Sequence, residues 1–161
     1  MIDKEIKLIS EYLCAHEQLL TTAESCTGGL VAKLITDLAG SSNWFERGLI
    51  TYSNQAKIDL LGVQLNSIDK FGAVSTEVAS EMAAGCVLHS PAQYGLSITG
   101  IAGPGGGSQE KPVGMVCFGW AKSVDGEVKL KTDVQYFEGN RQTIRENAAH
   151  HALTQLLNFL S

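Results

Sequence analysis

The sequence predicts an α/β fold, a single-domain three-layer sandwich in which helices flank a mixed β-sheet. Three observations lead to this prediction. Short apolar runs typical of strands alternate along the chain with stretches whose apolar residues recur at helical spacing. The almost wholly apolar run 113–121 is typical of a central strand covered on both faces. Asp125-Gly126 follows that run and is a strong hairpin signal, so one strand pair should be antiparallel.

The elements of the first half follow from periodicity and from capping residues. Asp3 and Ser53 are of the types that favour helix N-caps, and Gly40 and Gly62 are suited to helix C-termini. The expected elements are, in order, a helix over 3–18, a strand over 19–24, a helix over about 26–38, a strand over 49–52 and a helix from the Ser53 cap to residue 61.

In the second half, a turn-rich or short helical segment is expected up to residue 72, followed by a helix that Ser75 caps. The remaining expected elements are a strand over 96–99, a glycine-rich loop over 100–107, strands over 113–121 and 128–136, and a helix over 140–159. There is no internal repeat, low-complexity segment or linker, so residues 1–161 are predicted to form one domain.

Composition excludes several classes of function. The chain has 161 residues and a net charge of −5, which argues against general nucleic-acid binding. No apolar run approaches the roughly 18 residues of a membrane span, and the charged N-terminus lacks the apolar core of a secretory signal. We therefore expect a cytoplasmic protein with no membrane partner. Small α/β enzymes are often homo-oligomers, and the sequence leaves the oligomeric state open.

The cysteines and histidines indicate no metal or disulfide. The four cysteines lie far apart without a C-x-x-C pair, which indicates reduced thiols, and Cys14, Cys86 and Cys117 are expected to be small core residues. The four histidines form no recognised ligand spacing. We expect neither a metal nor another cofactor.

The stretch 23–29, Ala-Glu-Ser-Cys-Thr-Gly-Gly, lies at a predicted strand-to-helix junction. There the Ser25 hydroxyl would be held beside free N–H groups of a helix, which favour a developing negative charge. A nucleophilic serine with an oxyanion site uses this geometry. Serine is also a favoured N-cap, so a purely capping Ser25 is the alternative.

Lys57 and Tyr52 are a second candidate pair. Tyr52 ends a predicted strand, and Lys57 is expected within about the first turn of the following helix. The positive end of the helix dipole and partial burial both disfavour an ammonium ion there, and a neutral amine can act as a general base. The alternatives are a solvated surface lysine and a packed tyrosine with a satisfied hydroxyl.

The glycine-rich loop and two arginines are candidates for anion binding. The loop 100–107 follows a strand, where α/β sheets bind ligands, and its N–H groups can approach an anion closely. Arg141 and Arg145 lie at i and i+4 in the last helix, and a cation in a first helical turn favours an anionic partner there. A mobile loop, and surface pairing of the arginines with Glu138 or Glu146, are the alternatives.

Taken together, these motifs resemble the CinA C-terminal domain family, the nicotinamide-nucleotide amidohydrolases. Several long motifs at compatible spacing are more specific than any one of them, and they span nearly the whole chain. The resemblance indicates a stand-alone member of the family. It is carried by residues 22–29, 39–42, 44–48, 51–54, 56–57, 72–75, 99–107 and 111–114.

The resemblance implies an amidase that deamidates nicotinamide mononucleotide to nicotinate mononucleotide and ammonia, in pyridine nucleotide salvage. It implies Ser25 as nucleophile, Lys57 as base and Tyr52 as a catalytic residue hydrogen-bonded between or beside them. N–H groups near Cys26 and Thr27 are expected to receive the oxyanion, and the loop 100–107 with Arg141 to bind the phosphate. The expected substrate-binding residues are Glu24, Cys26, Thr27, Gly28, Thr99, Gly100, Gly103, Gly105, Gly106 and Arg141.

Four alternatives stay open at this point. Cys26 competes with Ser25 as nucleophile, because a helix N-terminus also activates a thiolate. Glu24 could offset the pyridinium charge of the substrate or orient Lys57. The chain could also be a nucleotide-binding regulatory module without turnover, or an amidase for another small amide.

Overall fold

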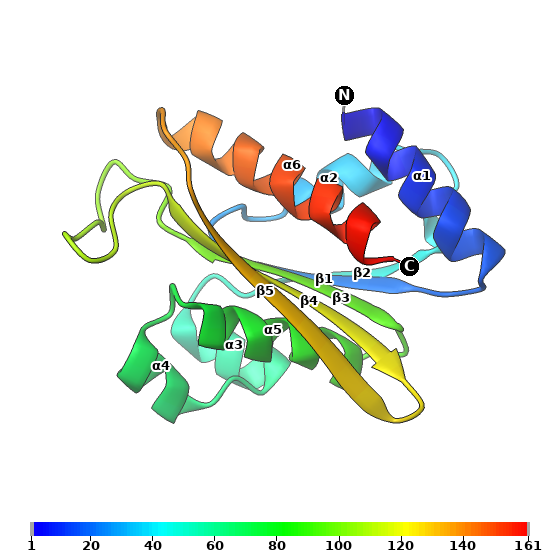
Figure 1. The fold of residues 1–161 in the computed structure, drawn as a ribbon, viewed down its shortest axis with the longest axis horizontal. Coiled ribbons are helices and arrows are strands. Elements are labelled where there is room, and N and C mark those ends of the chain that lie inside the picture. Colours follow the sequence, from blue (N-terminus) through cyan, green and yellow to red (C-terminus); the bar gives the residue numbers. More distant parts are fainter. Residues whose placement is uncertain (1, 161) are drawn as a thin grey trace.

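The computed structural model describes residues 2–160 and shows a five-stranded sheet in the order β2-β1-β3-β4-β5 (Figure 1). β1 is parallel to both β2 and β3, whereas β4 is antiparallel to β3 and β5. The predicted mixed sheet is therefore confirmed. The strands are β1 (Leu20–Glu24), β2 (Phe45–Ile50), β3 (Tyr94–Gly100), β4 (Met115–Val124) and β5 (Glu127–Tyr136).

Six α-helices within residues 2–160 cover the two faces of the sheet. α1, α2 and α6 lie on one face, and α3, α4 and α5 lie on the other (Figure 1). Each layer buries its own apolar cluster against the sheet, which gives the three-layer sandwich expected from the sequence. The helices are α1 (Ile2–Ala15), α2 (Leu30–Thr36), α3 (Asn54–Leu61), α4 (Leu65–Phe71), α5 (Thr76–Leu88) and α6 (Arg141–Phe159).

The antiparallel half of the sheet follows its sequence signals closely. β4 is buried along most of its length between β3 and β5, and the apolar run 113–121 falls largely within it. Asp125 and Gly126 both have positive φ, as a tight two-residue hairpin requires. Gly119 allows α5 to pack closely, because a Cβ at that position would lie 2.4 Å from the Ala79 carbonyl oxygen.

Four local predictions were wrong. Asp3 is not an N-cap, because it lies inside the first turn of α1. α2 begins at Leu30 and not near residue 26, because Gly28 and Gly29 adopt φ of +58° and +102° and keep residues 25–29 in a turn. β2 begins at Phe45 and ends at Ile50. Cys14 is exposed, since α1 buries Ile6, Ile9 and Leu13, and Cys14 lies about 100° around the helix from Leu13.

The parallel half of the sheet positions the functional residues. The carboxyl ends of β1, β2 and β3 meet at one edge, where the Ser25 N–H donates to the Ile98 carbonyl at 3.0 Å and the Thr51 N–H donates to the Glu24 carbonyl at 2.9 Å. The three neighbouring strands therefore lead, at the same edge of the sheet, into Ser25, Tyr52 and the loop 100–107. Ligands bind at such edges in open α/β sheets.

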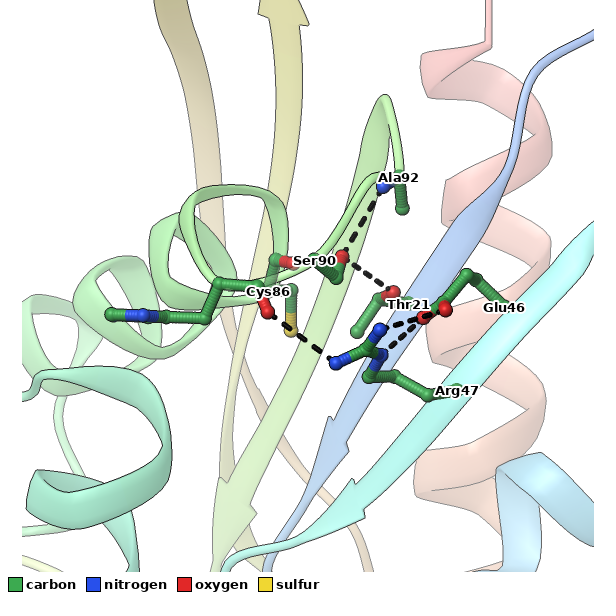
Figure 2. A network of polar contacts seen from close by, with 7 residues as sticks. Thr21, Glu46, Arg47, Cys86, Ser90 and Ala92 are labelled. Carbon is green, nitrogen blue, oxygen red and sulfur yellow. Dashed lines mark hydrogen bonds and ion pairs between the residues drawn. The ribbon is translucent and has the colours of Figure 1, made fainter.

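A polar network ties the opposite end of β1 to the end of α5 (Figure 2). Ser90 Oγ lies 2.9 Å from Thr21 Oγ1, donates to the Cys86 carbonyl at 2.5 Å and accepts from the Ala92 N–H at 3.2 Å. Beside it, Arg47 on β2 forms an ion pair with Glu46.

No helix within residues 2–160 combines the length and the apolar character needed to cross a membrane.

Candidate active site

Ser25 is the first residue after β1 and is 8% exposed. Its backbone is fixed on both sides, because its N–H donates to Ile98 and its carbonyl accepts from the Gly28 N–H at 3.1 Å. The N-cap position of α2 is occupied by Gly29, so the capping interpretation of Ser25 is wrong. The Ser25 hydroxyl is thus free of a capping role and points to Lys57.

Lys57 reaches Ser25 from the other face of the sheet. It lies in the first turn of α3, whose cap Ser53 accepts from the Ala56 N–H at 3.0 Å. Its Nζ is 3.1 Å from Ser25 Oγ, 2.9 Å from the Thr51 carbonyl oxygen and 3.4 Å from the Tyr52 carbonyl oxygen. Only 1% of the Lys57 side chain is exposed, which excludes the solvated surface lysine considered above.

The surroundings of Lys57 favour the neutral amine. No carboxylate lies within 4 Å of its nitrogen in the described part of the chain. Burial lowers the pKa of Lys57, opposed only by the proximity of the Cys26 thiol. A neutral amine can donate its two protons to the Thr51 and Tyr52 carbonyls, which leaves its lone pair for the Ser25 hydroxyl.

The Tyr52 carbonyl, and not its phenol, contacts the Ser25–Lys57 pair. This carbonyl accepts from Lys57, and Ser25 Oγ lies 3.5 Å from the same oxygen. The side chain is 61% exposed, and its hydroxyl accepts from Arg141 Nη2 at 3.3 Å. The phenol is therefore engaged by Arg141, and no hydrogen bond in the described structure places it between Ser25 and Lys57.

Glu24 and Cys26, the neighbours of Ser25, have different environments. The buried Glu24 carboxylate accepts from the Val31 N–H at 2.8 Å and the Ala32 N–H at 3.1 Å, so it caps α2 in place of a serine. The Cys26 thiol is 6% exposed, and burial raises its pKa to about 11. A thiol with that pKa is protonated at neutral pH and is a poor nucleophile.

A cavity of about 250 Å³ is lined by Cys26, the residue after Ser25, and by Tyr52, whose carbonyl accepts from Lys57; Ser25 and Lys57 themselves do not line it. Its walls come from the turn after Ser25, the segment after β2, the glycine-rich loop and the start of α6. Ile101 and Ala102 lie within the predicted loop 100–107 but were not named individually as binding residues, because their apolar side chains carry no signal in the sequence. The lining residues are Cys26, Tyr52, Gly100, Ile101, Ala102, Gly103, Gly105, Gly106 and Arg141.

Several predicted binding residues do not line this cavity. The Thr99 hydroxyl is buried and donates to the Ala73 carbonyl at 2.9 Å, which ties β3 to the turn before α5. Thr27 is fully buried, and Gly28 is exposed beside the guanidinium of Arg145. Within residues 2–160 there is also no group of three or more His, Cys, Asp or Glu side chains able to hold a metal.

Arg141 and Arg145 bind loop carbonyls instead of the glutamates considered above. Arg141 Nη1 donates to the Gly103 carbonyl at 2.7 Å and so holds the glycine-rich loop. Arg145 donates from Nε to the Cys26 carbonyl at 3.0 Å and from Nη2 to the Thr27 carbonyl at 2.9 Å. The sequence placed both on one helix face as candidates for anion binding, but nothing in the spacing of Arg145 reveals which carbonyls it would meet.

Comparison with known proteins identifies the family. The model of the CinA C-terminal domain matches residues 3–160. The chain belongs to the CinA C-terminal domain family. It is 49% identical over 160 residues, covering 97% of this chain and 95% of the relative, to nicotinamide-nucleotide amidohydrolase PncC of Escherichia coli strain K12.

Two further relatives are a longer protein that contains a matching region and a solved crystal structure. The chain is 48% identical to a CinA-like protein of Leptospira biflexa, where the match covers 94% of this chain and 36% of that longer protein. The crystal structure of competence/damage inducible protein CihA from Agrobacterium tumefaciens is 42% identical and superposes with a TM-score of 0.90 over 98% of this chain and 95% of that one. The fold described here is thus the fold of the family.

Proposed function

We propose that this CinA-family protein is an amidase that hydrolyses the carboxamide of nicotinamide mononucleotide, with Ser25 as nucleophile and Lys57 as general base. The observation that carries the proposal is the 3.1 Å approach of a buried amine without a counter-ion to a serine hydroxyl. The names of the similar PncC proteins supply the substrate. Their activity is nicotinamide-nucleotide amide hydrolysis, and near-full-length identity supports the same reaction here.

The first step transfers the Ser25 hydroxyl proton to Lys57 Nζ as Ser25 Oγ attacks the carboxamide carbon. Lys57 can accept this proton because burial lowers its pKa and no carboxylate holds it as an ammonium ion. The cationic pyridinium ring of the substrate would lower the lysine pKa further by like-charge repulsion. A positioned base of this kind contributes about 10²–10⁴-fold to the rate.

The tetrahedral oxygen needs hydrogen-bond donors near Ser25. The N–H groups of Cys26 and Thr27 are suited to this role, since neither has a protein acceptor within residues 2–160. One oxyanion donor is worth about 10²–10³-fold. The intermediate then collapses, the protonated Lys57 gives its proton to the leaving nitrogen, and ammonia departs.

Hydrolysis of the acyl-enzyme completes the reaction. Lys57, neutral again, takes a proton from water as the water oxygen attacks the ester carbon. Ser25 regains its proton as the nicotinate product leaves. One water is consumed and one ammonia is released for each carboxamide. Tyr52 has no proton-transfer role in this scheme, because its phenol is bound by Arg141.

The cavity lining supports a nucleotide substrate. Arg141 supplies a positive charge, and the N–H groups of Ala102, Gly103, Gly105 and Gly106 have no protein acceptor within the described residues. Backbone N–H groups of a glycine-rich loop together with an arginine suit a phosphate. We assign the phosphate to this side of the cavity and the carboxamide to the Ser25 side.

Ammonia release from nicotinamide mononucleotide tests the proposal. We expect purified protein to form nicotinate mononucleotide, Ser25→Ala to abolish turnover, and Cys26→Ala to remain largely active. The reverse result for the two variants would assign the nucleophile to Cys26. Binding of the nucleotide without ammonia release would favour a regulatory module, and release only from other amides in a panel would favour a different amidase.

A further inference from the structure

Arg145 binds the two backbone carbonyls that follow the nucleophile. Its Nε and Nη2 donate to the Cys26 and Thr27 oxygens at 3.0 and 2.9 Å, so two parallel donors of one planar guanidinium hold two consecutive peptide groups. Arg145 lies one turn after Arg141 on α6. Neighbouring arginines of one helix thus hold two segments that line the same cavity, the turn after Ser25 and the glycine-rich loop.

These contacts fix the direction of one N–H group. In a planar trans peptide the C=O and N–H bonds point in opposite directions. Because the Cys26 carbonyl points to Arg145 on α6, the Thr27 N–H points away from α6. The preceding peptide is fixed by the bond from the Gly28 N–H to the Ser25 carbonyl. The N–H groups of Cys26 and Thr27 are therefore left without protein acceptors but with fixed directions.

The backbone of this turn needs such support. Gly28 and Gly29 both have positive φ, and glycine leaves the chain many other conformations. A Cβ at Gly28 would lie 3.4 Å from Arg145 Nη2, so the guanidinium is in contact with the turn.

We propose that Arg145 is a positioning residue for the amidase reaction, which holds residues 25–28 so that the Cys26 and Thr27 N–H groups meet the oxyanion. The guanidinium also polarises the Cys26–Thr27 peptide and strengthens its N–H as a donor. This inference rests on the proposed function, because it needs an oxyanion at Ser25. It assigns to Arg145 an effect on the transition state and not on substrate affinity.

Steady-state kinetics of Arg145→Ala test this assignment. We expect kcat to fall about 10²-fold, as for loss of an oxyanion donor, with KM changed little. Arg145→Lys keeps the charge but loses the paired donors, so it should recover only part of the loss. Added guanidinium ion should restore activity to Arg145→Ala and not to Lys57→Met. Arg47→Met, a surface arginine at the other end of β2, is the matched control and should behave as wild type.

Labelling of Ser25 by a fluorophosphonate separates this inference from the choice of substrate. The probe forms an adduct whose oxygen occupies the oxyanion position, and its rate requires no nucleotide. Slower labelling in Arg145→Ala, with a melting temperature near that of wild type, supports the proposal even if nicotinamide mononucleotide proves not to be the substrate. Wild-type labelling and kcat in Arg145→Ala, or losses that follow the unfolded fraction, overturn it.

Discussion

The two ends of β1 differ in how their buried polar groups are paired. At the amino end, the Thr21 hydroxyl pairs with Ser90, and Ser90 in turn serves the Cys86 carbonyl and the Ala92 N–H (Figure 2). At the carboxyl end, the Lys57 amine is 1% exposed with only neutral oxygens around it. At the amino end the hydroxyl and backbone groups all have hydrogen-bond partners. At the carboxyl end burial disfavours the ammonium form of Lys57, which is the ordinary form of a lysine.

This difference separates stability from function within one strand. A satisfied network stabilises the fold and has no reactive group. A buried amine without a counter-ion destabilises its charged form, and this lowering of the pKa is what the proposed mechanism requires of a general base. Substitutions at the two ends should therefore have opposite signatures, a loss of stability at the Ser90 end and a loss of turnover at the Lys57 end.

Lys57→Met should have the largest effect on activity. It removes the base and should lower kcat about 10²–10⁴-fold. Loss of the donor to the Thr51 carbonyl opposes the gain from removing a buried amine, so the free energy of unfolding at pH 7 should change by no more than about 1 kcal/mol. Ammonia release and urea unfolding measure the two quantities. Activity within tenfold of wild type would remove Lys57 from the mechanism.

Ser90→Ala should show the reverse signature. It leaves the Thr21 hydroxyl and the Ala92 N–H without their partner, which should lower the free energy of unfolding by about 1–3 kcal/mol. The substituted residue is at the opposite end of β1 from Ser25, so kcat and KM of the folded protein should match wild type. A fall in kcat without loss of stability would show that the two ends are coupled.

The pH dependence of stability sharpens the comparison. The pKa of Lys57 is lowered in the folded state by burial, whereas the unfolded chain has the ordinary value of 10.5. Between the folded pKa and pH 10.5 the unfolded chain binds more protons, so stability gains with rising pH. Relative to Lys57→Met, wild type should gain about 1.4 kcal/mol for each pKa unit of depression across this window. A constant difference would mean that the amine is not desolvated.

Tyr52→Phe tests whether the Tyr52 phenol or only its backbone carbonyl matters for turnover. The substitution removes the hydroxyl that Arg141 binds and leaves the Tyr52 carbonyl in contact with Lys57. Because the phenol transfers no proton in the proposed mechanism, kcat should fall less than the 10²-fold typical of a lost proton-transfer group. A loss as large as that of Lys57→Met would return the phenol to the proton relay.

Thr22→Val should have the smallest effect. Thr22 lies in the middle of β1, and its hydroxyl is buried without a hydrogen-bond partner within the described chain. Replacing the hydroxyl by a methyl group removes an unpaired buried polar group, and valine favours a strand. The free energy of unfolding should therefore rise by up to about 1 kcal/mol, with unchanged activity. Thermal unfolding beside the ammonia assay measures both; a clear destabilisation would mean that the hydroxyl has a partner in solution.

Much of the fold could be predicted because its signals are local. Ser53 and Ser75 cap the expected helices, Gly62 ends α3, and Asp125-Gly126 forms the expected hairpin. The start of α2 could not be predicted in this way, because two glycines with positive φ delay the helix and Glu24, a residue before the turn, caps it. Capping from a preceding strand leaves no signature at the usual N-cap position.

For the site, too, local features could be predicted from the sequence and contacts between layers could not. Residue type and position in an element indicated Ser25, Lys57 and the glycine-rich loop, since each lies at a strand end or helix start. The partners of side chains that cross between layers depend on tertiary packing, so the sequence did not indicate that Arg145 binds the Cys26 and Thr27 carbonyls or that Arg141 binds the Tyr52 phenol.

The pH profile of Ser25 labelling tests the central claim most directly. A fluorophosphonate is reacted with wild type and with Lys57→Met across a pH series, and the modified peptide is quantified by mass spectrometry. The account predicts a wild-type rate that rises with pH and levels off above the lowered pKa of Lys57, and a slow variant that rises without a plateau. Equal rates with parallel profiles in the two proteins would contradict a neutral Lys57 as the base for Ser25.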